Sequence, residues 1–120
     1  MRPEWQPSSE VLDATALSEV LARHPVVVLH VWAVWNQVDR QCDERLRVVR
    51  EEFADRVVFG AIDADDPEQG AFLRSWAVGN LPAIVGFVRG ARVETVVGLR
   101  PVVELRARVA GWVERAFRPP

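Results

Sequence analysis

A single cysteine, Cys42, limits the thiol chemistry available to this chain of 120 residues. One cysteine can neither close an intrachain disulfide nor supply a multi-cysteine metal site. Cys42 is in register with Val38 and Leu46 on the apolar stripe of a predicted helix. Because free cysteines are commonly buried, we expect Cys42 to be a small hydrophobic residue of the core. The alternative is a reactive monothiol, which requires exposure and a lowered thiol pKa.

The acidic residues and histidines do not form a recognisable metal, phosphate or hydrolytic site. Residues 63–66, Asp-Ala-Asp-Asp, resemble the start of a calcium-binding loop, but its sixth position is Glu68 instead of glycine and its twelfth is Arg74 instead of glutamate. The two histidines and the cysteine lack metal-site spacing, and there is no glycine-rich phosphate loop. A hydrolytic site built on His30 would also need a nucleophile, and no serine motif supplies one. We therefore expect neither a metal nor another cofactor.

Charge and hydropathy narrow the classes of partner. The net charge is −2 and the basic residues are scattered, so we expect no binding to nucleic acid or to a membrane. The N-terminal residues contain no apolar stretch, so we expect no signal peptide. The longest apolar run, Val26 to Trp35 interrupted by His30, is far shorter than the roughly 20 residues that span a bilayer. A cytoplasmic protein is the expectation.

The elements that must position these residues alternate between apolar runs and amphipathic segments. Val26–Trp32 is a β-branched run typical of a strand covered on both faces. Val38–Ala54 carries apolar residues at intervals of three and four, which predicts a helix. The pattern then continues to an antiparallel hairpin and a final helix that begins near Pro101. The other predicted strands lie at about 9–12, 57–62, 83–88 and 91–97, and the other predicted helices run to about Arg23 and Trp76.

The order β-α-β-α-β-α-β-β-α predicts a single α/β domain with a mixed sheet. The parallel part comes first, and an antiparallel hairpin closes it. We expect a flexible leader over residues 1–8, where two prolines and a serine interrupt any periodicity, and one domain over residues 9–118.

Four segments in this chain occur in an order that is informative when they are taken together. They are the strand Val26–Val31 leading into Trp32-Ala33-Val34-Trp35, the apolar helix that follows, the loop Asn80-Leu81-Pro82-Ala83, and a closing hairpin with Phe87, Arg89-Gly90 and Val97-Gly98-Leu99 before the last helix. Together they resemble the thioredoxin family from Ser9 to Phe117. The resemblance implies a thioredoxin fold, with a central mixed sheet of about five strands flanked by about four helices.

The stretch Asn36-Gln37-Val38-Asp39 stands where the family carries its Cys-x-x-Cys motif. Thiol–disulfide exchange by two thiols needs both cysteines, so dithiol oxidoreductase activity is excluded and we expect no catalytic residue. Asn36 is a favourable helix N-cap, and the acidic Asp39 three positions later suits a capping box. We expect the pair to cap the following helix. A polar contact to a ligand or partner is the alternative.

His30 lies where members of the family carry a buried aspartate beneath the second cysteine. Asp39 occupies the position of that cysteine, so the resemblance implies a specific possibility, a hydrogen bond or ion pair between His30 and Asp39. The alternative is a strand histidine whose nitrogens are satisfied by backbone groups or water.

The resemblance also implies that the Leu81–Pro82 peptide bond is cis and that the Leu81 backbone can pair with an extended peptide. The other residues expected to line this shallow apolar groove are Trp35, Gln37, Val97 and Gly98. Peptide addition at such an edge needs no cysteine. The alternative is that Pro82 only shapes the fold.

These expectations favour a redox-inactive module that binds protein or peptide, or acts like a chaperone, through the groove around Trp35 and Pro82. Its partner would be a protein or an extended peptide of unspecified identity. Two alternatives stay open. One is a monothiol redox protein that uses Cys42, and the other is a structural accessory subunit of a larger complex.

Overall fold

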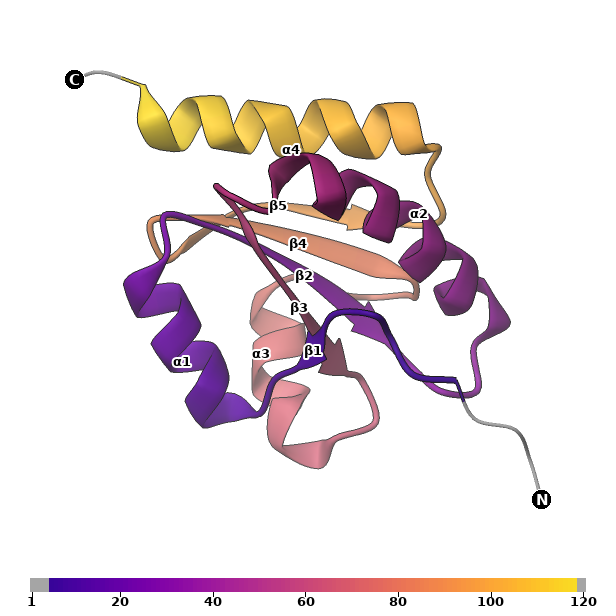
Figure 1. The fold of residues 1–120 in the computed structure, drawn as a ribbon. Coiled ribbons are helices and arrows are strands. Elements are labelled where there is room, and N and C mark those ends of the chain that lie inside the picture. Colours follow the sequence, from indigo (N-terminus) through magenta and orange to yellow (C-terminus); the bar gives the residue numbers. More distant parts are fainter. Residues whose placement is uncertain (1–4, 119–120) are drawn as a thin grey trace.

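The computed structural model of the protein describes residues 5–118. Five strands form one mixed sheet in the order β1-β3-β2-β4-β5, with helices on both faces (Figure 1). β1, β3 and β2 run parallel, whereas β4 is antiparallel to β2 and β5 is antiparallel to β4. The elements are β1 (Glu10–Val11), α1 (Ala14–Arg23), β2 (Val26–Trp32), α2 (Gln37–Phe53), β3 (Val58–Asp63), the 3-10 turn η1 (Pro67–Gln69), α3 (Gly70–Ser75), β4 (Ala83–Val88), β5 (Ala91–Val97) and α4 (Val102–Phe117).

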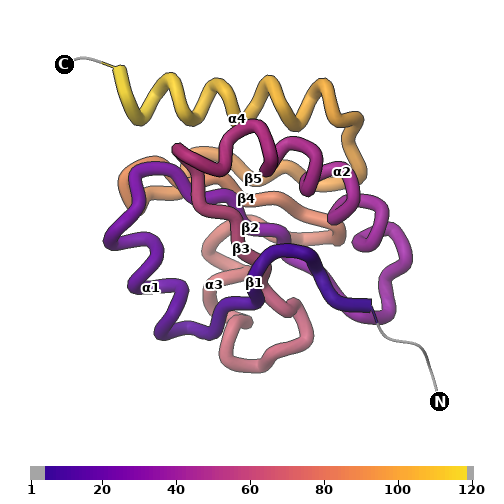
Figure 2. Tube along the Cα trace, viewed as in Figure 1, coloured from indigo at the N-terminus to yellow at the C-terminus, as the bar shows by residue number. Residues whose placement is uncertain are grey.

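Alternate side chains of the central strand β2 enter two separate cores. Val26 and Val28 pack with α2 and α4 on one face, while Val27 and Leu29 pack with α1 and α3 on the other. Every residue of β2 is buried, and its sequence is a nearly continuous apolar run because both faces are covered. Figure 2 shows the same layers, with α2 and α4 on one side of the sheet and α1 and α3 on the other.

The third helical segment differs most from its prediction. We expected one helix up to about Trp76, but the structure has the 3-10 turn η1 followed by the short helix α3. The Asp66 side chain accepts the Glu68 N–H at 3.0 Å, and Pro67 follows at the first position of the turn. This local bonding favours the tighter i to i+3 winding over an α-helical start. None of the helices within residues 5–118 is both long and apolar enough to cross a membrane.

Positions 1–4 of the leader predicted over residues 1–8 lie outside the described residues. In its described part, the Trp5 ring packs against Trp32 with the ring centroids 5.2 Å apart. The N–H and the hydroxyl of Ser8 donate to the Asp43 carboxylate on α2 at 2.9 and 3.1 Å. Residues 5–8 therefore contact both the sheet and α2. The flexibility of the leader and the domain boundaries at residues 9 and 118 stay predictions.

Candidate functional site

The predicted site residues gather where β2 ends and α2 begins. A turn after Trp32 leads to Asn36, the N-cap of α2. Asn36 Oδ1 accepts a hydrogen bond from the Val38 N–H at 3.0 Å. It thereby satisfies one of the N–H groups that a helix start leaves unpaired, a contact typically worth about 1 kcal/mol. The expected helix cap at Asn36 is present.

Asp39 does not complete the capping box, and that part of the prediction is wrong. A capping-box carboxylate accepts the N–H of the N-cap residue, but the Asn36 N–H donates to the Ala33 carbonyl at 3.1 Å. The Asp39 side chain turns inward instead, is fully buried, and accepts the Ala33 N–H through Oδ2 at 2.9 Å. The carboxylate therefore ties the turn after β2 to the first turn of α2.

His30 lies beside Asp39 beneath this turn. His30 Nε2 is 3.5 Å from Asp39 Oδ1, and the two side chains are 1% and 0% exposed. This distance suits an ion pair and exceeds the usual hydrogen-bond range of about 2.7–3.2 Å. Within residues 5–118, neither ring nitrogen of His30 has a hydrogen-bond partner, and neither does Asp39 Oδ1. Backbone groups of this part of the chain therefore do not satisfy His30.

Trp5, in the N-terminal segment, packs onto the His30 side of this pair. Its indole stacks on the His30 imidazole with centroids 6.5 Å apart and planes at 27°. We did not identify Trp5 as a site residue from the sequence, because it precedes the first predicted element in a segment without periodicity. The residue type could have identified Trp5, because an isolated tryptophan in a polar leader indicates a packing contact.

Cys42 lies one turn further along α2, in the core. Its side chain is 1% exposed. Burial raises the thiol pKa to about 12, with a further contribution from the nearby Asp39 and Asp43 carboxylates. A thiol with this pKa is not a thiolate at neutral pH, and the thiolate is the nucleophile. The core position predicted for Cys42 is confirmed.

Trp35 is the exposed aromatic residue of the site. Its side chain is 60% exposed, and the indole N–H donates to both carboxylate oxygens of Asp65, at 3.0 and 3.3 Å. Asp65 was not predicted as a site residue from the sequence. Its position just after β3 could have placed it near Trp35, because β2 and β3 are parallel and end at the same edge of the sheet. The bond orients the indole ring while most of its surface stays open to solvent.

A pocket of 250 Å³ lies next to Trp35, which lines it together with Leu81. The Leu81 N–H donates to the Asn80 side-chain oxygen at 2.9 Å in an exposed contact. The structure therefore brings two of the predicted groove residues to one pocket. The rest of its wall is largely apolar and consists of Ala64, Leu73, Val78, Gly79 and Asn80.

The other predicted groove residues do not line this pocket. Gln37 lines a separate hollow of 690 Å³, which also has Trp35 in its wall. Pro82 is buried, its peptide bond with the preceding residue is cis, and its carbonyl accepts the Gly98 N–H at 2.8 Å. Val97 and Gly98 are half-buried. Trp35 therefore separates two hollows, with the cis-proline loop on one side.

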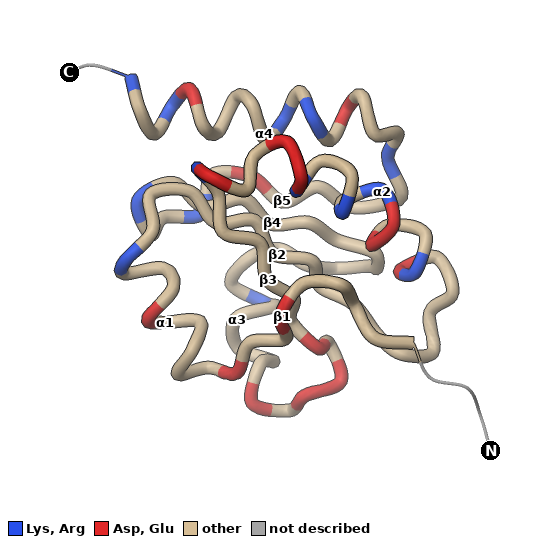
Figure 3. Tube along the Cα trace, viewed as in Figure 1, with Lys and Arg blue, Asp and Glu red and all other residues tan. Residues whose placement is uncertain are grey.

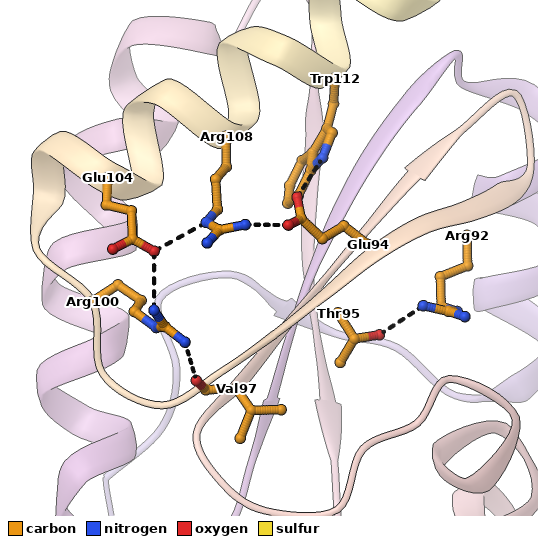
Figure 4. Close-up of polar contacts among 8 residues, drawn as sticks. All are labelled: Arg92, Glu94, Thr95, Val97, Arg100, Glu104, Arg108 and Trp112. Atoms are coloured by element: carbon orange, nitrogen blue, oxygen red, sulfur yellow. Dashed lines mark hydrogen bonds and ion pairs between the residues drawn. The ribbon is translucent and has the colours of Figure 1, made fainter.

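A charged network anchors the end of β5, next to this loop (Figure 4). Arg100 donates to the Val97 carbonyl at 2.9 Å and to Glu104 at 3.3 Å. Glu104 also accepts from Arg108 at 3.0 Å, and Arg108 pairs in turn with Glu94. Because these groups are partly buried, they fix β5 and its exit against α4 more firmly than exposed ion pairs do.

We compared the sequence and the fold of this chain with those of known proteins. No family model matches the chain. Thioredoxin 1 of Synechococcus elongatus is 28% identical over 98 residues, which span 82% of this chain and 90% of that protein. The thioredoxin of Pyropia yezoensis is 27% identical over 105 residues, which span 88% and 96%. A mutant thioredoxin from Halobacterium salinarum has a TM-score of 0.76 at 25% identity, covering 92% of this chain and 96% of that one. The predicted fold is confirmed.

Proposed function

Because this chain is a thioredoxin-like protein in which Asn36 and Asp39 stand in place of the two cysteines, we propose that it acts by binding and not by redox chemistry. The surface around Trp35, Leu81 and Pro82 receives an extended segment of a partner protein, as in a protein-interaction or chaperone-like module. We further propose that it acts in the cytoplasm, where unpaired cysteines are common.

The observation that carries this proposal is the exposed indole of Trp35 beside an apolar pocket. Tryptophan is enriched among the residues that dominate binding energy at protein interfaces. The bond to Asp65 holds the ring in one orientation, so little side-chain entropy is lost when a partner covers it. Leu81 lines the same pocket and adds apolar surface to it. The site is therefore a preformed place for one apolar side chain.

An extended segment can use this site by pairing with the Leu81 backbone and placing an apolar side chain in the pocket. Within residues 5–118, the Leu81 N–H donates to the neighbouring Asn80 side chain and to no other group, in an exposed contact. Exchanging that bond for one to a partner carbonyl changes the free energy little, because one hydrogen bond replaces another. The affinity then comes mainly from the apolar contact with Trp35.

The monothiol alternative has less support. Cys42 is buried and its pKa is raised, so the conditions for a reactive thiolate are not met. The protein should show no dithiothreitol-driven reduction of insulin. A variant with both Asn36→Cys and Asp39→Cys should gain some, because it places two thiols at a helix N-terminus. A folded double variant without activity would contradict our alignment of residues 36–39 with Cys-x-x-Cys.

The binding proposal is tested by NMR titration with a permanently unfolded client, reduced and carboxymethylated α-lactalbumin. We expect shifts of the Trp35 indole N–H and of the backbone amides of Val78 and Leu81. Trp35→Ala should weaken binding by at least about tenfold, as expected for removal of a central aromatic contact.

The matched control is Val103→Ala on α4, which removes another exposed apolar side chain, 68% exposed, away from the pocket. It should bind the client as the native protein does. Equal affinity of the Trp35→Ala and Val103→Ala variants, or shifts confined to another surface, would refute the proposed site.

A further inference from the structure

Another hollow lies at the opposite end of the sheet, where β2 starts. It has a volume of 510 Å³ and lies between the C-terminal ends of α1 and α4 and the turn that joins β4 to β5. Its charged and polar lining includes Arg23, His24 and Arg89, and its apolar lining includes Leu21, Pro25 and Phe117. The Phe117 side chain is 52% exposed. The hollow therefore combines cations with an exposed aromatic ring.

The hollow continues past Phe117 into a neighbouring one of 420 Å³. The two share His24, Pro25 and Phe117 in their linings. We call the two together the polar-end depression. A ligand that fills both must extend on either side of the Phe117 ring, which suits a peptide segment better than a compact ion.

The charge of the polar-end depression is positive. Within residues 5–118, no Asp or Glu lines the larger hollow, and Arg23 forms no ion pair. Asp55 lines the smaller hollow but pairs with Arg56 at 3.4 Å. Figure 3 shows basic segments at this end of the molecule and acidic segments in the loop after β3. The C-terminal ends of α1 and α4 offset part of this charge, but an acidic ligand still meets net positive charge here.

Arg89 is held in place for such a contact. Its guanidinium Nη2 donates to the Ala116 carbonyl at 2.7 Å, and its backbone N–H donates to the Pro25 carbonyl at 2.8 Å. The attraction between arginines and helix C-termini explains why Arg23 lies at the end of α1. The same attraction does not explain why the Phe117 ring is exposed beside Arg89 in this hollow. Guanidinium groups pair with carboxylates in two-pronged geometry. Within residues 5–118, the Arg89 guanidinium makes one hydrogen bond, through Nη2, so its other N–H groups are available to a carboxylate.

We propose that the polar-end depression binds an acidic segment of a partner protein, with carboxylates at Arg23 and Arg89 and an apolar side chain against Phe117. This surface lies at the other end of the sheet from Trp35, so it is independent of the function proposed above. One chain can then hold two different segments at once.

The test uses two short synthetic peptides that carry one leucine and one phenylalanine, among glutamates in one peptide and among lysines in the other. We expect the glutamate peptide to shift the backbone amides of Ala22, Gly90 and Phe117 but not those of Trp35 and Leu81. The lysine peptide should not bind. Raising the ionic strength from about 0.05 to about 0.5 M should weaken the binding.

Arg23→Gln should weaken binding of the glutamate peptide about threefold, as expected for one partly solvated charge pair. Combining it with Arg89→Asn should reach about tenfold. Asparagine suits position 89, where φ is 50°, because it tolerates the left-handed region. Arg74→Gln on α3 removes the same charge elsewhere and is the matched control.

Three outcomes would overturn the proposal. They are equal binding of the two peptides, shifts centred on Trp35 and Leu81, and equal affinities of the Arg23→Gln and Arg74→Gln variants. Arg23 is exposed, so its single substitution gives a folded variant even if the double substitution disturbs the hairpin turn. The amide shifts separate this site from the Trp35 site, and each proposal can fail without the other.

Discussion

Replacing Asp39 with alanine removes the side chain that links the end of β2 to α2. The buried Ala33 N–H then loses its acceptor, at a cost of about 1–3 kcal/mol. The substitution also leaves a small cavity next to His30, which adds a smaller loss. We expect the free energy of unfolding to fall by about 2–4 kcal/mol in total.

Asp39→Asn is the matched variant, because it keeps an acceptor oxygen of the same shape for the Ala33 N–H. It should cost about 1 kcal/mol. Urea unfolding followed by circular dichroism measures both, and the slope with denaturant should stay unchanged. The reasoning is refuted if Asp39→Ala costs less than about 0.5 kcal/mol, or if the asparagine variant loses as much as the alanine variant.

A double-mutant cycle then isolates the contact between His30 and Asp39. With His30→Ala and Asp39→Asn as the single changes, groups 3.5 Å apart in the interior should show a coupling of about 0.5–3 kcal/mol. A coupling near zero would mean that the two side chains are neighbours without a net interaction.

Two further predictions concern the core. Native Cys42 should react with a thiol reagent at pH 8 only through unfolding. The reason is that a pKa of about 12 leaves about one thiolate in ten thousand at this pH. The rate of labelling should therefore rise with pH. Rapid labelling of the folded protein would contradict this. Gly86→Ala should cost about 1–3 kcal/mol, because its new Cβ would lie 2.7 Å from the Trp112 ring. Gly111→Ala, with open space around it, should be neutral or stabilising in the same urea assay.

Much of the fold was predictable because it follows from periodicity within single segments. The apolar run Val26–Trp32 is a buried central strand, and the stripe through Cys42 and Leu46 is the buried face of α2. The N-cap at Asn36 also followed from local rules, since its bond reaches only two residues along the chain. The split of the third helical segment was missed, because a 3-10 turn and an α-helix start with the same residue types.

The sequence by itself determined what this site cannot do. With one cysteine and with Asn36 and Asp39 at the motif positions, the atoms needed for dithiol exchange are missing in any conformation. Only the tertiary structure decided where Asp39 points. Position 39 suits a capping box, but the Ala33 N–H, in the turn after β2, and His30, on β2, draw the carboxylate inward.

The Trp35–Asp65 bond was decided in the same way, by the common edge at which β2 and β3 end. Such contacts join residues far apart in the chain. Their energies depend on burial and on the direction of each side chain, which local periodicity does not specify.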